Sequence, residues 1–298
     1  MVMREYEYHI CDVFTSRPLE GNQLAVFLDA EGLSDTEMQA IARETNLSET
    51  TFICRRDVTT ERERGIRVRI FTVQEELPFA GHPTLGTSST IRSLLPEFHG
   101  AQTIVLDLNV GQVPVVFTED SEIPYAFGEM TQPEPVFGLL HDAARVAPLL
   151  GLSVEDISEA WPLQTVSTGM PYCIVPLRTV EALGRMRLQF RASEEYRTQS
   201  DVKFFYAIAE ESEGVWRARM QFYNGEDPAT GSAAGCAISY LVRHGIVPPR
   251  QRVHLRQGIE MRRPSDLYLS ADSVEGRIEE VRVGGRTVPV ARGRLFLE

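Results

Sequence analysis

The sequence predicts a mixed α/β protein built from two related domains, and three observations support this fold class. The 298 residues are enough for two domains of ordinary size. Strand-like and helical segments alternate along the whole chain. The stretch 67–86 aligns with 217–236 at a constant shift of 150 residues and without a gap. Because this shift is half the chain length, the simplest interpretation is a duplicated domain.

In the first half, apolar patterning predicts short strands and two helices. Ser34 and Glu37 predict a capping box at the start of a helix over 33–45, whose apolar residues fall on one face. A second helix, rich in small residues, is expected over 84–95 and begins near His82. The predicted strands are 6–14, 21–28, 50–54, 65–72, 103–108 and 112–117.

A polar, proline-bearing segment at 119–135 predicts the crossover between the domains. We therefore expect an N-terminal domain at 1–122, which the C-terminal strand 284–298 could join, and a C-terminal domain at 123–283. The tail over 252–298 is expected to form short strands and turns. Helices are predicted at 138–150, 153–160 and 231–244, and strands at 163–168, 172–177, 203–209 and 215–223.

Composition excludes several classes of function. A formal net charge of −12 argues against binding to nucleic acid or to anionic lipid, because both need clustered Lys and Arg. No stretch has the length and apolarity of a membrane span or a signal peptide. The four cysteines are far apart and lack metal-ligand spacing, which predicts reduced thiols, no metal site and a cytoplasmic location.

Both copies of the repeat end a strand, turn through E-x-P-x-x-G and open a helix of small residues. These openings, at Gly81 and Gly231, would present unpaired backbone N–H groups and partial positive charge to a shared cleft. Such a cleft suits a carboxylate or a developing enolate. Each opening contributes about 0.3–1 kcal/mol when exposed and up to ~2 kcal/mol when partly buried. Orientation of an anion is therefore possible, but a separate group must transfer protons.

The two copies differ at positions where chemistry would need them to differ. His82 in the first copy aligns with Ser232 in the second, and Leu77 aligns with Asp227. Each polar residue also has a purely structural interpretation. His82 could be a satisfied core histidine, Asp227 could brace the turn before a proline, and Ser232 could be a helix cap. Glu49 lies between a helix and an apolar strand, and spacing alone does not distinguish a catalytic from a solvated glutamate.

Several blocks of the sequence resemble the PhzF-like family, which is named for the phenazine-biosynthesis isomerase. The blocks occur in order from about residue 12 to residue 265 and cover most of the chain. They are "DVFTSRPLEGNQLAVF", "LSETTF", "RIFTVQEELPFAGHPTLG", "GEDPATGSAAG" and "RQGIEMRRPS".

This resemblance implies a duplicated fold of the diaminopimelate-epimerase type. Each domain would be a curved, mostly antiparallel sheet around a central helix, and the active site would lie between the domains. The resemblance also implies a homodimer and an isomerase without a cofactor.

The same resemblance assigns roles to individual residues. Glu49 matches the proton-transferring glutamate of the family, and His82 and Asp227 match the His and Asp that position the substrate. Gly231 and Ser232 match the Gly-Ser that opens a helix. Related racemases use two opposed cysteines, but "FAGHPTLG" has none, and Cys236 lies one helical turn beyond Ser232. A two-thiol mechanism is therefore disfavoured.

The resulting hypothesis is that Glu49 removes a proton from one carbon of a small carboxylate and returns it to another carbon. Substrates similar to trans-2,3-dihydro-3-hydroxyanthranilate are expected. His82 and Asp227 would hold polar groups of the substrate, while Ser232 and the backbones of Gly81 and Gly231 would hold its carboxylate. A lyase or dehydratase that uses the same glutamate, and a non-catalytic small-molecule binding protein, remain alternatives.

Overall fold

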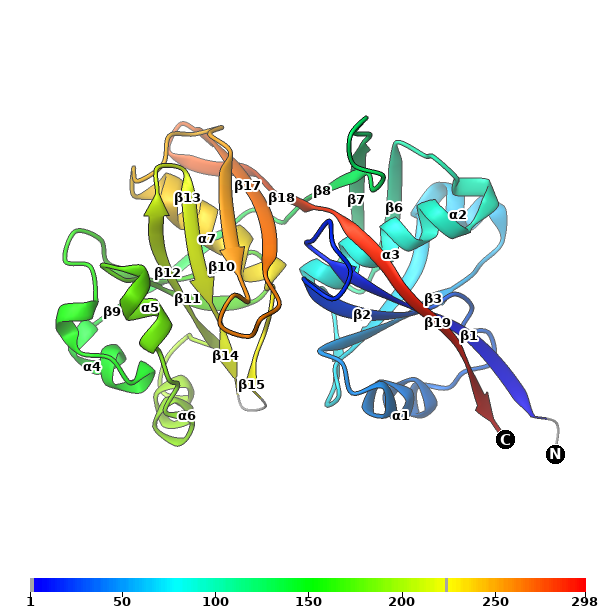
Figure 1. Ribbon diagram of the computed structural model, residues 1–298, viewed down its shortest axis with the longest axis horizontal. Helices are drawn as coiled ribbons and strands as arrows, with labels where there is room; N and C mark the ends of the chain where they lie inside the picture. The colour runs from blue at the N-terminus through cyan, green and yellow to red at the C-terminus, as the bar shows by residue number, and fades with distance from the viewer. Residues whose placement is uncertain (1–2, 223–224) are drawn as a thin grey trace. The chain divides into compact units, whose positions relative to one another are not determined.

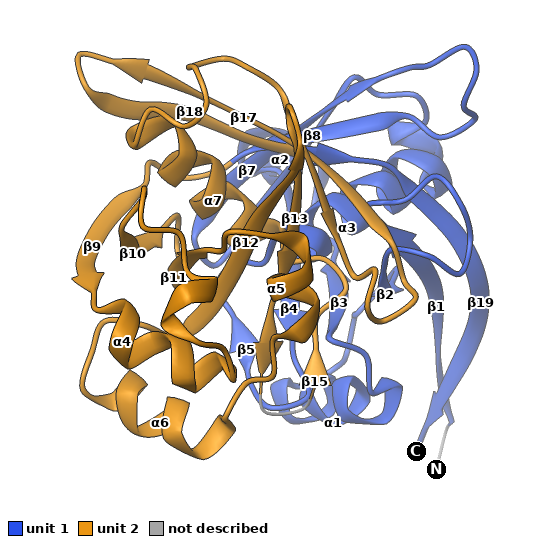
Figure 2. Cartoon of the chain, turned by 60° about the vertical axis from the view of Figure 1, so that its left-hand side comes forward, with its two compact units in different colours: residues 1–131, 284–298 blue, residues 132–283 orange. Residues whose placement is uncertain are grey.

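The computed structural model describes residues 3–222 and 225–298, which divide into two compact units. Unit 1 comprises residues 1–131 and 284–298, and unit 2 comprises residues 132–283 (Figure 2). The chain therefore passes from one unit to the other twice. Tyr223 ends the strand predicted at 215–223 and lies, with Asn224, within the aligned repeat. Both of these residues fall outside the described ranges.

Unit 1 is a curved sheet that surrounds one helix. Its strands are β1 (Arg4–Val13), β2 (Asn22–Phe27), β3 (Glu49–Cys54), β4 (Ile66–Phe71), β5 (Glu76–Leu77), β6 (Thr103–Leu108), β7 (Gly111–Thr118), β8 (Phe127–Thr131) and β19 (Thr287–Leu297). Its helices are α1 (Asp35–Thr45), α2 (Val58–Arg64), α3 (Gly81–Leu94) and the 3-10 turn Pro96–Phe98. The helix α3 contacts strands on several sides, including β1, β2, β6, β7 and β8 (Figure 1).

Small side chains allow α3 to occupy the centre of unit 1. Most of its residues are buried, and at Gly86 the helix packs directly against side chains of β1 and β2. A Cβ atom at Gly86 would lie only 2.7 Å from side-chain atoms of Val13 and Leu24. The absence of a side chain is therefore required for this approach.

The helix α1 confirms the predicted capping box. The Ser34 side chain accepts from the Glu37 backbone N–H, and the Glu37 side chain accepts from the Ser34 backbone. The buried face of α1 consists of Met38, Ile41 and Ala42. The sequence pattern thus determined both the start of this helix and the side that packs.

Unit 2 is also a sheet with a central helix. Its strands are β9 (Val136–His141), β10 (Leu163–Ser167), β11 (Pro171–Pro176), β12 (Phe204–Ser212), β13 (Val215–Arg219), β14 (Gln221–Phe222), β15 (Gly225–Glu226), β16 (Val253–Gln257), β17 (Ser265–Val274) and β18 (Arg277–Gly285), whose last two residues belong to unit 1. Its helices are α4 (Ala143–Val146), α5 (Val180–Arg185), α6 (Phe190–Thr198), α7 (Gly231–Arg243) and the 3-10 turns Ala147–Leu150 and Val154–Asp156. The helix α7 is buried along almost its whole length.

The two units have the same strand connectivity. In unit 1 the pairings β1·β2, β2·β3, β3·β4, β4·β6 and β6·β7 are antiparallel, parallel, antiparallel, parallel and antiparallel. The pairings β10·β11, β11·β12, β12·β13, β13·β16 and β16·β17 in unit 2 follow the same order. Strands β19 and β9 pair antiparallel with β1 and β10. The duplication inferred from a 20-residue repeat thus extends over the strand pairings of both units.

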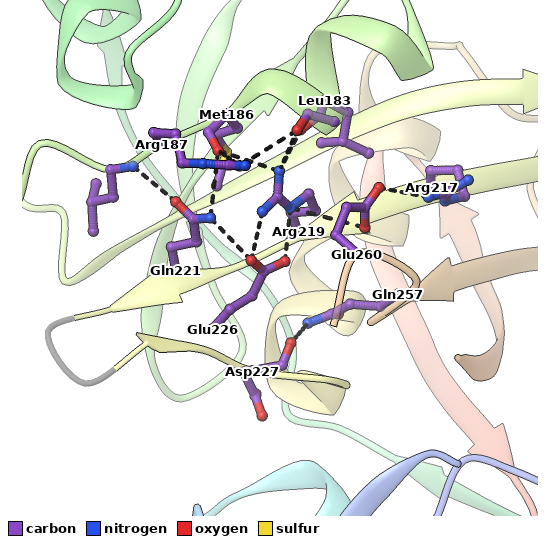
Figure 3. Close-up of polar contacts among 12 residues, drawn as sticks. Leu183, Met186, Arg187, Arg217, Arg219, Gln221, Glu226, Asp227, Gln257 and Glu260 are labelled. Atoms are coloured by element: carbon purple, nitrogen blue, oxygen red, sulfur yellow. Dashed lines mark hydrogen bonds and ion pairs between the residues drawn. The ribbon is translucent and has the colours of Figure 1, made fainter. Parts of the chain in front are cut away.

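An ion pair occupies the same place in both repeats. Arg69 Nε and Nη2 donate to the two carboxylate oxygens of Glu76 at 2.8 and 2.6 Å. Arg219, 150 residues later, makes the same two contacts with Glu226 at 2.7 and 2.6 Å (Figure 3). In each unit this bidentate pair joins a strand to the turn that precedes the central helix.

Three sequence expectations were wrong in detail. The predicted helix at 138–150 begins as strand β9, because a short apolar run does not distinguish strand from helix by periodicity. The predicted helix at 153–160 is a single 3-10 turn, and the tail forms strands as long as 11 residues. Helices α2, α5 and α6 were not predicted, because they are short and give little helical periodicity.

Candidate functional site

Unit 1 brings two of the predicted site residues together. Glu49 is the first residue of β3, and His82 is the second residue of α3. Their side chains approach with His82 Nε2 3.5 Å from Glu49 Oε2, slightly longer than an ordinary hydrogen bond. The His82 side chain is 4% exposed and that of Glu49 is 16% exposed. The carboxylate of Glu49 therefore faces a more deeply buried imidazole.

The imidazole of His82 is neutral. Burial lowers the pKa of His82 to about 3, because a charged ring would lose its hydration. The side-chain amide nitrogen of Asn22 lies 3.2 Å from His82 Nδ1. The ring also has a hydrogen bond with the backbone of Gln23, so the orientation of His82 is set by the start of β2.

Unit 2 carries the second set of predicted residues on one turn. Asp227 follows β15, is buried, and accepts a 2.6 Å hydrogen bond at Oδ2 from the Thr230 hydroxyl. Its backbone N–H donates to the Met220 carbonyl, and its backbone carbonyl accepts from the Gln257 side chain. Figure 3 shows this contact between Gln257 and Asp227. The position of Asp227 is thus set by the turn and by a neighbouring strand.

Gly231 and Ser232 are the first two residues of α7, as predicted. The Ser232 hydroxyl lies 2.8 Å from the Tyr172 hydroxyl, and both side chains are buried. The N-cap residues Ala80 and Thr230 form no side-chain cap on α3 or α7. Both helix starts are therefore buried without a side-chain cap, an arrangement that suits a bound anion.

The cysteine closest to this turn is a protonated thiol. Burial raises the pKa of Cys236 to about 11, and the Thr168 hydroxyl is 3.6 Å from its sulfur. Burial likewise raises the pKa of Cys11, in unit 1, to about 12. Neither thiol is poised to act as a thiolate base at neutral pH, which weighs further against a two-thiol mechanism.

The residues that support this site were not predicted from the sequence. Asn22, Tyr172, Tyr206, Thr230 and Gln257 hold the predicted residues in place but received no role. One signal was available, since Thr230 aligns with Ala80 and is another position where the repeats differ in polarity. Asn22 and Gln257 lie inside the quoted "GNQLAVF" and "RQG" segments, but their partners are distant in the sequence.

Within residues 3–222 and 225–298, no group of three or more His, Cys, Asp or Glu side chains is arranged to hold a metal ion. None of the helices in this part of the chain is both long and apolar enough to cross a membrane.

The chain has a duplicated fold of the diaminopimelate-epimerase type. The family model described as "Phenazine biosynthesis-like protein" (PhzC-PhzF) matches residues 11–293. The chain belongs to this family.

Named relatives agree with this membership. An uncharacterized isomerase of Mesorhizobium japonicum is 37% identical over 308 residues, covering 99% of this chain and 100% of the relative. The trans-2,3-dihydro-3-hydroxyanthranilate isomerase of Pseudomonas aeruginosa is 34% identical, covering 98% and 100%. The solved structure of a predicted epimerase from P. aeruginosa superimposes with a TM-score of 0.83 at 36% identity, covering 98% and 100%. The chain is an isomerase.

The buried neutral state of His82 predicts a pH dependence of stability. In the unfolded chain His82 binds a proton near pH 6.5, but in the folded protein it does so only near pH 3. Its contribution to stability is therefore complete above pH 6.5 and is lost as the pH falls toward 3. His82→Gln should flatten the stability profile by up to about 1.4 kcal/mol per pH unit between pH 6 and pH 4.

Urea unfolding at several pH values measures this slope. The matched control is His99→Gln, because His99 is exposed on the surface of unit 1. Equal slopes in His82→Gln and the wild type would show that His82 is protonated in the folded protein.

Proposed function

We propose that this isomerase moves a proton between two carbons of a small unsaturated carboxylate similar to trans-2,3-dihydro-3-hydroxyanthranilate, and that Glu49 carries the proton. The observation that supports this most strongly is the approach of Glu49 to a neutral, buried His82 at 3.5 Å. A relative at 34% identity is named for that isomerisation. The substrate, the pathway and the role of Glu49 are parts of this proposal.

The proposed step conserves all atoms. The Glu49 carboxylate removes a proton from a carbon next to a double bond, and the electrons of the broken C–H bond form a new double bond. The original double bond shifts its electrons to a second carbon, which takes the proton from the Glu49 carboxylic acid. One residue thus acts first as base and then as acid, a role worth about 10²–10⁴-fold in rate.

The remaining residues would stabilise the charge that develops during this step. The buried imidazole of His82, beside Glu49, would hold a polar group of the substrate. Asp227 would bind a donor group of the substrate. We further propose that Ser232 and the helix starts at Gly81 and Gly231 receive the substrate carboxylate.

Incubation in D₂O with a panel of β,γ-unsaturated carboxylates, including dihydrohydroxyanthranilate, tests the proposal. NMR should show migration of a double bond, and mass spectrometry should show a product with the mass of the substrate apart from exchanged deuterium. Because Glu49 can return the same proton without exchange, bond migration is the primary readout. Loss of water would identify a lyase, and binding without bond migration would identify a binding protein.

The resemblance also supports a homodimer. Light scattering on the purified protein should then give about twice the chain mass of 33.5 kDa. A mass equal to one chain would contradict this part of the proposal.

A further inference from the structure

The turn before the central helix has a polar hydrogen-bond chain in unit 2 that unit 1 lacks. The chain consists of Tyr206, Gln257, Thr230 and Asp227, all of them buried. Tyr206 donates to Gln257 Oε1 at 2.8 Å, and Gln257 Nε2 donates to Thr230 Oγ1 at 2.9 Å. Thr230 Oγ1 donates to Asp227 Oδ2 at 2.6 Å. The last member is one of the proposed substrate-binding residues.

Two backbone contacts fix the orientation of the Gln257 amide. The Thr230 backbone N–H, which can only donate, lies 3.1 Å from Oε1. The Asp227 backbone carbonyl, which can only accept, lies 2.8 Å from Nε2. If the oxygen and nitrogen of this amide were exchanged, its NH₂ group would face the Thr230 N–H and its oxygen would face the Asp227 carbonyl. The observed orientation is therefore the one that satisfies every contact.

The fixed amide determines where each proton of the chain lies. Burial raises the pKa of Tyr206 well above its ordinary value, so its hydroxyl keeps its proton and donates to Oε1. Since Gln257 Nε2 donates to Thr230 Oγ1, the Thr230 hydroxyl proton is directed to Asp227. Oδ2 of Asp227 must then be an acceptor, and a hydrogen bond to a carboxylate oxygen favours its ionised form.

Unit 1 shows that the fold does not need this chain. In the gap-free repeat, Leu77 and Ala80 stand where unit 2 has Asp227 and Thr230. Arg67 and Arg217 are equivalent positions of the repeat, and their partners in the parallel strand pairs are Asp107 and Arg256. The residues that follow these partners, Leu108 and Gln257, are therefore counterparts. The same turn thus forms in unit 1 with three apolar residues. Formation of the turn therefore does not explain the polar chain of unit 2.

We propose that Gln257 and Thr230 are positioning residues that hold the side chain of Asp227 as an oriented, ionised acceptor for a donor group of the substrate. The role of Asp227 toward a substrate rests on the proposed function. The state of Asp227 in the free protein can be measured without knowing any substrate.

The test is a ¹³C NMR titration of the Asp227 carboxyl carbon in the full-length protein, with the resonance assigned from Asp227→Asn. Thr230→Val removes the hydroxyl at nearly constant volume, and Thr230→Ser keeps it. We expect the titration midpoint to rise by about one pH unit, a tenfold change in proton affinity, in Thr230→Val. The midpoint of Thr230→Ser should stay near that of the wild type.

Thr84→Val is the matched control, because its buried hydroxyl in α3 donates to the Ala80 carbonyl and not to Asp227. This variant should leave the Asp227 midpoint unchanged. A Thr230→Val midpoint equal to that of the wild type would overturn the proposal. Gln257→Leu provides a second test, and its midpoint should rise in the same direction if the variant folds.

Activity adds an independent readout. With a substrate identified, the acidic limb of the kcat/KM profile should move with the NMR midpoint in Thr230→Val and return in Thr230→Ser. If no carboxylate is isomerised by the wild type, the proposed function fails, but the NMR result still decides the role of the chain.

Discussion

Glu49→Gln should lower turnover by about 10²–10⁴-fold or more while the protein stays folded. The amide has nearly the same shape as the carboxylate, but it cannot accept the proton that the proposed reaction removes. Glu49 is partly buried at the start of β3, so the substitution keeps the packing and changes only the charge and the proton affinity. The measurement is kcat by NMR for the substrate that the D₂O panel identifies.

The control for this experiment is Glu44→Gln, the same chemical change at an exposed position of α1. It should leave kcat unchanged. Ligand affinity in Glu49→Gln should remain within a few fold of the wild type, because the binding groups are elsewhere. Turnover in Glu49→Gln similar to that of the control would remove Glu49 from the mechanism.

Arg219→Met should destabilise the protein by about 3–5 kcal/mol, because it leaves a buried carboxylate without its partner. The Arg219 side chain is 2% exposed and that of Glu226 is 11% exposed. Arg219 also donates to the carbonyl oxygens of Leu183, Gly184 and Met186, so the substitution removes contacts around the end of α5 as well. Figure 3 shows Leu183 and Met186 beside the guanidinium.

The duplication supplies the control. Arg69→Met breaks the equivalent pair in unit 1, where the Arg69 and Glu76 side chains are 17% and 24% exposed. Water can solvate the remaining carboxylate there, and the loss should be closer to about 1 kcal/mol. Calorimetry and urea unfolding of both variants measure the difference. Equal losses would mean that burial does not control the strength of this repeated ion pair.

Much of the fold was predictable because its signals are local. The capping box of Ser34 and Glu37, the apolar face of α1 and the glycine start of α3 each depend on residues within one or two turns. The duplication was predictable because the repeat kept its ion-pair residues and its helix-opening glycine. Short elements such as β9 and α5 were not predictable, because a few residues carry too little periodicity to separate strand from helix.

For the site, the sequence by itself identified Glu49, His82, Asp227, Gly231 and Ser232 as candidates, through the differences between repeats and the family resemblance. Their catalytic roles stay predictions. Only the tertiary structure decided that His82 is buried and neutral, with Asn22 against its Nδ1 atom. It also decided that Gln257 holds the turn of Asp227. The physical reason is distance along the chain, since these contacts join residues 30 and 60 positions apart and form only when the strands and central helices pack.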